Sequence, residues 1–168
     1  MPSLLGDAFA HHIWATEQLL DACSALSREQ VNANVPGTYG SILATLRHLV
    51  GSDCWYLSFF RDDVSEPAED SDLSIDELRS IITSNGKAWM ELLDEALDPD
   101  RDVVEHGEGW DFHAPVGLRL AQVVHHGTDH RSQVCTALTT LGVTPPLIDL
   151  WDFGEATNRT RSERQPTS

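Results

Sequence analysis

Apolar residues recur with a period close to 3.6 over four long segments of this chain. That period places them on one face of an α-helix, so we predict helices over about residues 3–26, 41–60, 74–97 and 118–141. The sequence contains little strand signal. Amphipathic helices bury their apolar faces best against one another, and we therefore predict an all-α fold with a four-helix bundle.

Residues with helix-capping chemistry mark the ends of these segments. Ser41 is a suitable N-cap for the second helix, and Ser74 with Glu77 has the form of a capping box at the start of the third. Gly142 suits the left-handed position after the fourth helix, and Pro145-Pro146 prevents that helix from continuing. The helix boundaries are thus predicted by side-chain chemistry as well as by the apolar period.

The segments between and after the helices carry other patterns. Residues 62–72 are acidic and predict a loop, whereas residues 101–116 combine glycines with alternating aromatic residues and predict an irregular or hairpin-like connection before the fourth helix. A short extra C-terminal helix is expected near residues 147–157. With no internal repeat and no domain linker, we expect a single domain over residues 1–156 and a polar tail without fixed structure over residues 157–168.

The charge and composition of the chain disfavour several classes of partner. The 11 basic residues against 27 acidic ones give a net charge of −16, which disfavours binding to nucleic acid and to anionic membranes. No apolar run approaches the roughly 20 residues that span a bilayer, and the N-terminus lacks the layout of a signal peptide. We therefore expect a cytoplasmic protein that acts on a small-molecule substrate. Its three cysteines are expected to be free thiols.

Two histidines four residues apart, His126 and His130, lie in the fourth predicted helix. Side chains at positions i and i+4 point the same way, and two imidazoles so placed can bind one divalent ion at about 2.0–2.1 Å per nitrogen. His48, in the second predicted helix, can supply a third ligand. Three histidines leave coordination positions open, as in a reactive metal site. The competing interpretation is a solvated histidine cluster without metal, because the chain has 8 histidines.

Other metal chemistries of helical proteins do not fit the sequence. Ferritin-like di-iron sites require Glu-x-x-His pairs, and the chain has none. Zincins require His-Glu-x-x-His, in which the glutamate is the general base. Gly127 occupies that position here, so the pattern favours a three-histidine site without the base of a peptidase.

The order of these motifs resembles that of the DinB/YfiT-like family of metal-binding proteins. The segments that carry the resemblance are residues 10–20 (AHHIWATEQLL), 46–49 (LRHL), 126–133 (HGTDHRSQ) and 141–146 (LGVTPP), followed by Trp151. The resemblance covers roughly residues 4 to 155. It implies a four-helix bundle that holds one divalent ion, often nickel or zinc, on three histidines that match His48, His126 and His130.

The resemblance also implies a type of reaction. Characterised relatives include S-transferases and isomerases that use low-molecular-weight thiols such as mycothiol or bacillithiol. An ion with open positions can lower the pKa of a bound thiol or of bound water, so both thiol transfer and hydrolysis stay open. We expect a metal-dependent enzyme of one of these kinds, and the alternative is a non-catalytic metal- or ligand-binding module of a stress response.

Further residues are candidates for the walls of the site and for assembly. We expect His12, Trp55 and Arg131 to bind the thiol or substrate, and Arg131 suits an acidic neighbour or an anionic substrate. Core packing is the competing interpretation. We also expect a homodimer, because aromatic residues are common in interfaces and this chain has more of them than one bundle interior needs. The large aromatic residues in question are Trp14, Trp55, Trp89, Phe59, Phe60 and Trp151.

Overall fold

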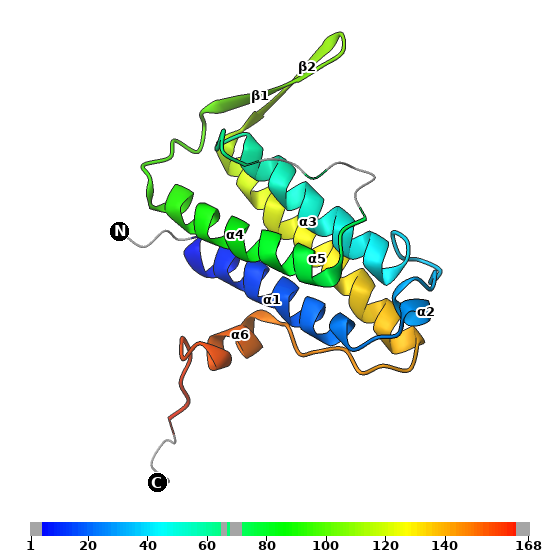
Figure 1. Cartoon of the computed structure of the whole chain (residues 1–168). Coiled ribbons are helices and arrows are strands. Elements are labelled where there is room, and N and C mark those ends of the chain that lie inside the picture. Colours follow the sequence, from blue (N-terminus) through cyan, green and yellow to red (C-terminus); the bar gives the residue numbers. More distant parts are fainter. Residues whose placement is uncertain (1–4, 65–66, 68–71, 164–168) are drawn as a thin grey trace.

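A computed structural model describes residues 5–64, 67 and 72–163 of the chain (Figure 1). Over these residues the chain is mostly helical, with six helices and one antiparallel two-stranded hairpin. The predicted loop over residues 62–72 and the predicted tail over residues 157–168 lie partly outside the described residues. None of the described helices is both long and apolar enough to cross a membrane.

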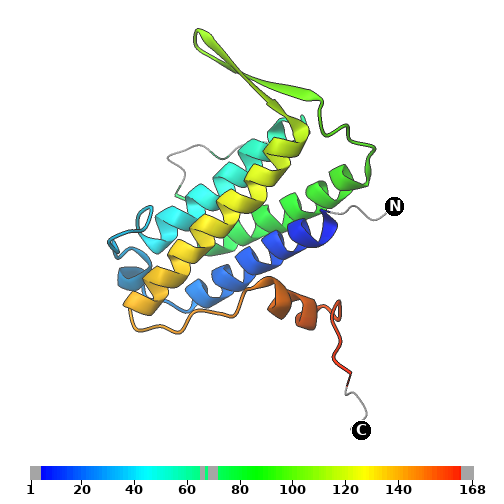
Figure 2. The same cartoon turned by 180° about the vertical axis from the view of Figure 1, so that it is seen from behind.

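Four long helices lie side by side and form the body of the molecule (Figures 1 and 2). They are α1 (Gly6–Ser24), α3 (Ile42–Ser58), α4 (Ile75–Asp94) and α5 (Val116–Thr140). α1 packs against α4 and α5, and α3 packs against the same two helices. Each helix lies within a few residues of a segment that the apolar period predicts, so the predicted helical framework is confirmed.

Side-chain caps and one glycine set where the long helices begin and end. Ser41 accepts a hydrogen bond from the Ala44 N–H at 3.2 Å, and Ser74 and Glu77 form the predicted capping box. Gly142 adopts φ +76° directly after α5, a left-handed conformation that favours glycine. These local interactions set the register of the helices and thereby the directions in which their side chains point.

Two features differ from the predicted all-α fold. The connection between α4 and α5 contains strands β1 (Asp102–Gly107) and β2 (Trp110–Pro115), which pair as a regular antiparallel hairpin, the second of the two forms predicted for residues 101–116. This hairpin projects beyond one end of the bundle (Figure 1). A four-residue helix, α2 (Arg28–Val31), also follows α1. It begins with a capping box at Ser27 and Gln30, but a single turn is too short to show an apolar period.

Two clusters of buried side chains fill the bundle. One includes Leu46 and Ile82, and the other includes Trp89 and reaches Val103 of the hairpin. The three cysteines form no disulfide, as predicted. Burial raises the pKa of the Cys23 thiol to about 12, so this side chain behaves as a core residue and not as a reactive group.

A short helix packs against α1 near the end of the described chain. α6 (Leu150–Ala156) confirms the predicted C-terminal helix, and Asp149 caps its first turn. Beyond α6, Arg159 forms an ion pair with Asp7 at 2.6 Å. The described part of the tail is therefore in contact with α1, while residues 164–168 lie outside the described residues.

Candidate metal centre

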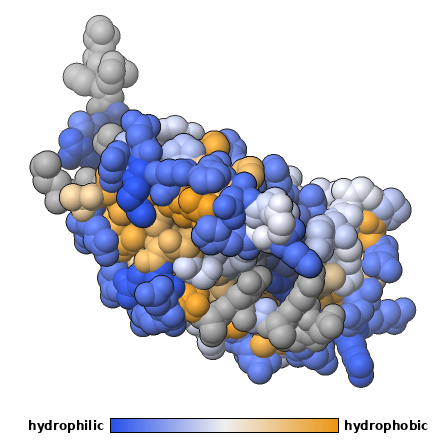
Figure 3. Space-filling model, turned by 90° about the horizontal axis from the view of Figure 1, so that it is seen from above, coloured by the Kyte–Doolittle hydropathy of each residue, from blue (hydrophilic) through white to orange (hydrophobic). Residues whose placement is uncertain are grey.

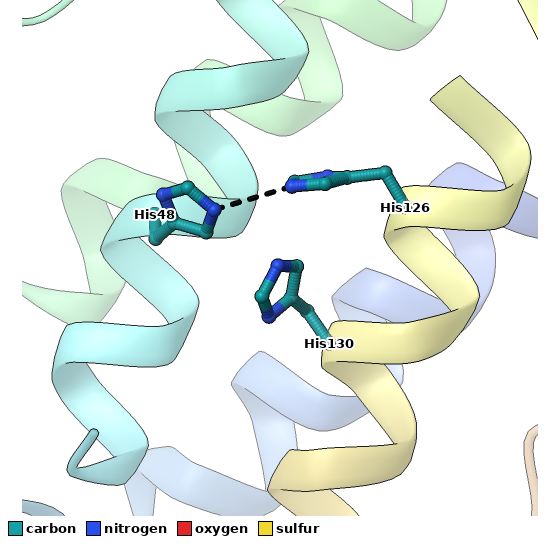
Figure 4. Close-up of side chains that lie close together, drawn as sticks. All are labelled: His48, His126 and His130. Carbon is teal, nitrogen blue, oxygen red and sulfur yellow. Dashed lines mark hydrogen bonds between the residues drawn. The ribbon is translucent and has the colours of Figure 1, made fainter. Parts of the chain in front are cut away.

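Three histidines from two helices meet between α3 and α5 (Figure 4). His48 comes from the middle of α3, and His126 and His130 come from successive turns of α5. Their side chains point toward one another, and one ring nitrogen from each lies within 4.8 Å of the others. The structure therefore brings together the three histidines that the sequence suggests as metal ligands.

The spacing of the nitrogen atoms fits a single divalent ion. His126 Nε2 lies 3.2 Å from His48 Nε2. Two imidazole nitrogens that share a tetrahedral ion at about 2.0–2.1 Å lie roughly 3.3 Å apart, which agrees with this distance. His130 is the third donor, and no other His, Cys, Asp or Glu among the described residues joins the group. Three imidazole donors suit a divalent transition metal such as zinc, copper, iron or nickel and leave coordination positions for another ligand.

The surroundings keep two of these rings in the neutral form that binds metal. Burial lowers the pKa of His126 to about 4, and the neighbouring His130 and His48 act in the same direction. Burial, followed by the nearby His130, also lowers the pKa of His48 below its ordinary value. A cationic ring has no lone pair to offer, so a lowered pKa keeps the donors available at neutral pH.

His130 is oriented by a residue one turn further along α5. The side-chain oxygen of Gln133 accepts a hydrogen bond from the Tyr39 N–H at 2.9 Å and lies 3.3 Å from His130 Nδ1. Because this oxygen can only accept, His130 Nδ1 carries the proton and donates it. The Nε2 lone pair is thus left for an ion. Hydrogen bonds of this kind fix the orientation of metal-binding histidines.

Two tyrosines that were not among the predicted site residues flank the histidines. Tyr39, from the loop before α3, stacks on His48 with ring centroids 4.1 Å apart and meets His130 edge-on at 5.4 Å. Tyr56 of α3 lies edge-on to His126 at 5.8 Å. Tyr39 is 57% exposed, so this side of the site faces solvent. Tyr56 lies eight residues after His48 and shares its broad helix face, a signal available in the sequence. No pattern in the sequence indicates the path of the loop that carries Tyr39.

Two of the predicted binding residues, His12 and Arg131, lie in the core next to the ligand-bearing turns of α5. Arg131 Nη1 donates a hydrogen bond to His12 Nδ1 at 2.9 Å, and His12 Nε2 donates to Asp53 Oδ1 at 3.0 Å. His12 is 1% exposed and Arg131 is 2% exposed. Neither side chain therefore forms an open wall of the site, and both are placed to support it from inside.

Asp53 is the buried acidic member of this network, and it was not among the residues predicted from the sequence. Its carboxylate also accepts hydrogen bonds from Asn85 Nδ2 at 2.8 Å and from Trp89 Nε1 at 3.1 Å. Burial lowers the pKa of Arg131 to about 10, and the charge of Asp53 opposes this shift. Asp53 and Arg131 are thus opposite charges on either side of the His12 ring. An acidic residue inside the apolar stripe of α3 was the available signal.

Gly127 allows α5 to approach this network closely. A Cβ at this position would lie 2.4 Å from His12 Cε1 and 2.7 Å from Arg131 Nη1, which is too close for any side chain. The residue that stands where zincins have their catalytic glutamate is therefore a packing glycine. Its contact with His12 fixes the turns of α5 that carry His126 and His130.

Trp55, the third predicted binding residue, lies half-buried on α3, seven residues after His48. Its ring meets Tyr56 at a centroid distance of 4.8 Å and Phe59 at 4.9 Å, both edge-on. Tyr56 in turn contacts His126. Trp55 therefore belongs to an aromatic lining that continues from the histidines along α3.

All of the described helices, from α1 to α6, lie in a part of the chain that matches one protein family. No curated protein sequence matches the chain. Residues 1–165 match the DinB family, and this stretch includes His48, His126 and His130. The chain therefore belongs to the DinB family.

Proposed function

We propose that the protein binds one divalent metal ion, nickel or zinc, through His48, His126 and His130. The observation that carries this proposal is the convergence of three imidazole nitrogens from two helices within 4.8 Å of one another. Burial keeps His48 and His126 neutral, and the contact of His130 with Gln133 leaves its Nε2 free. The family resemblance supports the same set of ligands.

We further propose that the site activates a low-molecular-weight thiol for reaction with an electrophilic small molecule, as an S-transferase or isomerase. When bound, the ion would supply Lewis acidity, which lowers the pKa of a thiol or of water. The three histidines would hold it with positions left for the thiol. Tyr39 and Tyr56 would line the space for the ligand, and the exposed side at Tyr39 would admit it. The reducing cytoplasm, which keeps thiols free, is the expected setting.

Binding followed by turnover tests the thiol reaction. Protein loaded with Co²⁺, whose visible spectrum responds to thiolate ligands, is titrated with mycothiol and with bacillithiol. We expect a saturable sulfur-to-metal band that His126→Ala lacks, and then transfer of the bound thiol to one of a panel of electrophiles. A thiol that ligates the metal without any transfer would favour the non-catalytic binding module. Ester or amide hydrolysis without thiol would favour activation of water.

We also propose a homodimer, with a contact surface different from the one that the aromatic count suggested. Trp89 is fully buried, and Trp151 is the one member of that set of six that is largely exposed, at 73%. Leu147 and Leu150 beside it in sequence are 78% and 49% exposed. An exposed apolar surface of this kind suits isologous pairing. Light scattering at micromolar concentration should give twice 18.6 kDa, and a mass of 18.6 kDa would rule the dimer out.

A further inference from the structure

Arg119 is a buried cation whose acidic partner among the described residues, Glu105, lies at long range. It lies in the first turn of α5, is 4% exposed, and its Nε has no hydrogen-bond partner among the described residues. Its Nη2 donates to the Val103 carbonyl at a long 3.3 Å, and its ion-pair partner Glu105 lies 4.0 Å from Nη1. Buried charges are normally paired and hydrogen-bonded at shorter range. The protein itself therefore satisfies this guanidinium only in part.

The place of Arg119 on α5 makes its positive charge less favourable still. The N-terminus of a helix carries partial positive charge from its free N–H groups. The first turn of α5 contains no acidic residue, and its N-cap, Pro115, provides no side-chain cap. A cation gains nothing from the helix dipole at this end, whereas an anion is stabilised by both the dipole and the guanidinium. The electrostatics of this end of α5 thus favour a negatively charged ligand.

A continuous strip of aromatic rings joins Arg119 to the histidine site. The guanidinium lies 4.1 Å from the ring centroid of Phe59, at the end of α3. Phe59 meets Trp55 at 4.9 Å, and Trp55 meets Tyr56 at 4.8 Å. Tyr56 reaches His126 at 5.8 Å. Arg119 and His126 are also seven residues apart on α5, which places them on one helix face about 10 Å apart along its axis.

The hairpin covers the outer side of Arg119. Phe112 of β2 lies with its ring centroid 5.8 Å from the guanidinium and is 52% exposed. Seen from the hairpin side, hydrophobic residues gather in a patch with a hydrophilic rim (Figure 3). The side chain of Glu105 on β1 is 25% exposed. A long, partly exposed ion pair of this kind is one that a better-placed anion can replace.

We propose that Arg119 binds the carboxylate of an elongated organic acid whose reactive group reaches the three histidines. The apolar body of this ligand lies along the rings of Trp55 and Phe59, and its carboxylate takes the place of Glu105 at the guanidinium. The planar guanidinium is suited to bidentate binding of a carboxylate. This inference names the substrate class of the proposed metal site and rests on that proposed function.

Two probes that differ only in the carboxylate test the inference. Co²⁺-loaded protein is titrated with mercaptooctanoate and with mercaptooctanol, and the thiolate-to-cobalt absorption is followed. We expect the wild type to bind the carboxylate probe roughly ten-fold or more tightly, as a charge-assisted hydrogen-bonded pair would produce. Arg119→Met should remove this preference by weakening the carboxylate probe alone. Arg28→Met, at an exposed arginine of α2, should keep it.

Glu105→Gln provides a second test that leaves Arg119 in place, in case Arg119→Met does not fold. Without the competing carboxylate, mercaptooctanoate should bind several-fold more tightly, while mercaptooctanol should bind as before. The inference is overturned if the wild type shows no preference for the carboxylate probe. It is also overturned if the preference survives Arg119→Met, or if Glu105→Gln leaves it unchanged.

A metal-free measurement separates this inference from the metal site. Calorimetry of His126→Ala protein with octanoate and octanamide reports on Arg119 without any thiol ligation. A preference for octanoate that Arg119→Met removes supports the carboxylate site, whether or not thiols ligate the cobalt of the loaded protein. Thiol ligation without any carboxylate preference would reject the role of Arg119 and leave the metal site standing.

Discussion

His12 donates a hydrogen bond from Nε2 to the Asp53 carboxylate at 3.0 Å, and both side chains are 1% exposed. The same ring accepts a hydrogen bond from Arg131, the neighbour of His130 in sequence. Because Asp53 belongs to α3, His12 to α1 and Arg131 to α5, and because Asp53 also accepts hydrogen bonds from α4, this buried network joins all four long helices. Two of them carry the three histidines, so the network fixes the distance between the two halves of the candidate metal centre.

Replacing Asp53 with asparagine should destabilise the protein. The substitution keeps the shape of the side chain but removes the buried negative charge that accepts hydrogen bonds from His12, Asn85 and Trp89, and hydrogen bonds to charged groups are worth about 1.5–3 kcal/mol each. Urea unfolding measures the loss. Asp129→Asn, at an exposed position on α5, is the control and should change stability by less than about 0.5 kcal/mol. If Asp53→Asn changed the free energy of unfolding as little as Asp129→Asn, the network would add no stability.

Gly127→Ala should destabilise the protein by about 1 kcal/mol or more, because the new Cβ would lie 2.4 Å from the His12 ring and overpacking strains the core. Gly51 of α3 is a matched control, since nothing lies within 4 Å of a Cβ there. Gly51→Ala should stabilise the protein by about 0.5–1 kcal/mol through helix propensity. Denaturant midpoints compare the two. A shift in the same direction for both would contradict the close packing of α5 on His12.

The metal-free protein should lose stability as pH falls from about 6.5 to about 4. The pKa of His126 is lowered from 6.5 to about 4, first by burial and then by the neighbouring histidines. In that window the unfolded chain binds a proton that the folded chain does not, so acid favours unfolding. His126→Asn should flatten the dependence of the urea midpoint on pH. An unchanged slope in this variant would mean that the folded ring titrates normally.

Gln133→Leu should weaken metal binding about 10-fold, because the hydrogen bond that orients His130 is lost while all three ligands remain. Competition with a chelator measures the affinity. Gln122→Leu, at an exposed position on the same helix, should bind metal as tightly as the wild type. If both variants match the wild type, the contact of Gln133 with His130 does not contribute to metal binding.

Helical periodicity made the three histidines of the candidate site predictable. The spacing of His126 and His130 determines their common direction locally, without any knowledge of the fold. The apolar stripes then suggest which face of each helix points inward, which places His48 opposite them. The bundle framework was predictable for the same reason. The hairpin was harder to predict, because a strand of six residues gives too short a pattern to distinguish a regular pairing from an irregular loop.

The parts that could not be predicted depend on contacts between distant segments. Tyr39 and Gln133 are 94 residues apart, and their hydrogen bond exists only because the loop before α3 folds over α5. His12 and Asp53 are 41 residues apart on different helices. A buried acid and a buried histidine carry no local sign that they are partners, so their roles appear only once the helices are packed.

Metal analysis of the purified protein tests most directly whether His48, His126 and His130 bind one divalent ion. After incubation with Ni²⁺ or Zn²⁺ and removal of loosely bound metal, we predict about one ion per chain in the wild type. The double variant His126→Ala/His130→Ala should retain less than about a tenth of that, because a single histidine cannot hold the ion. His106→Ala, which removes an exposed histidine of the hairpin, should retain the full amount. Equal metal content in the wild type and the double variant would contradict the proposed site.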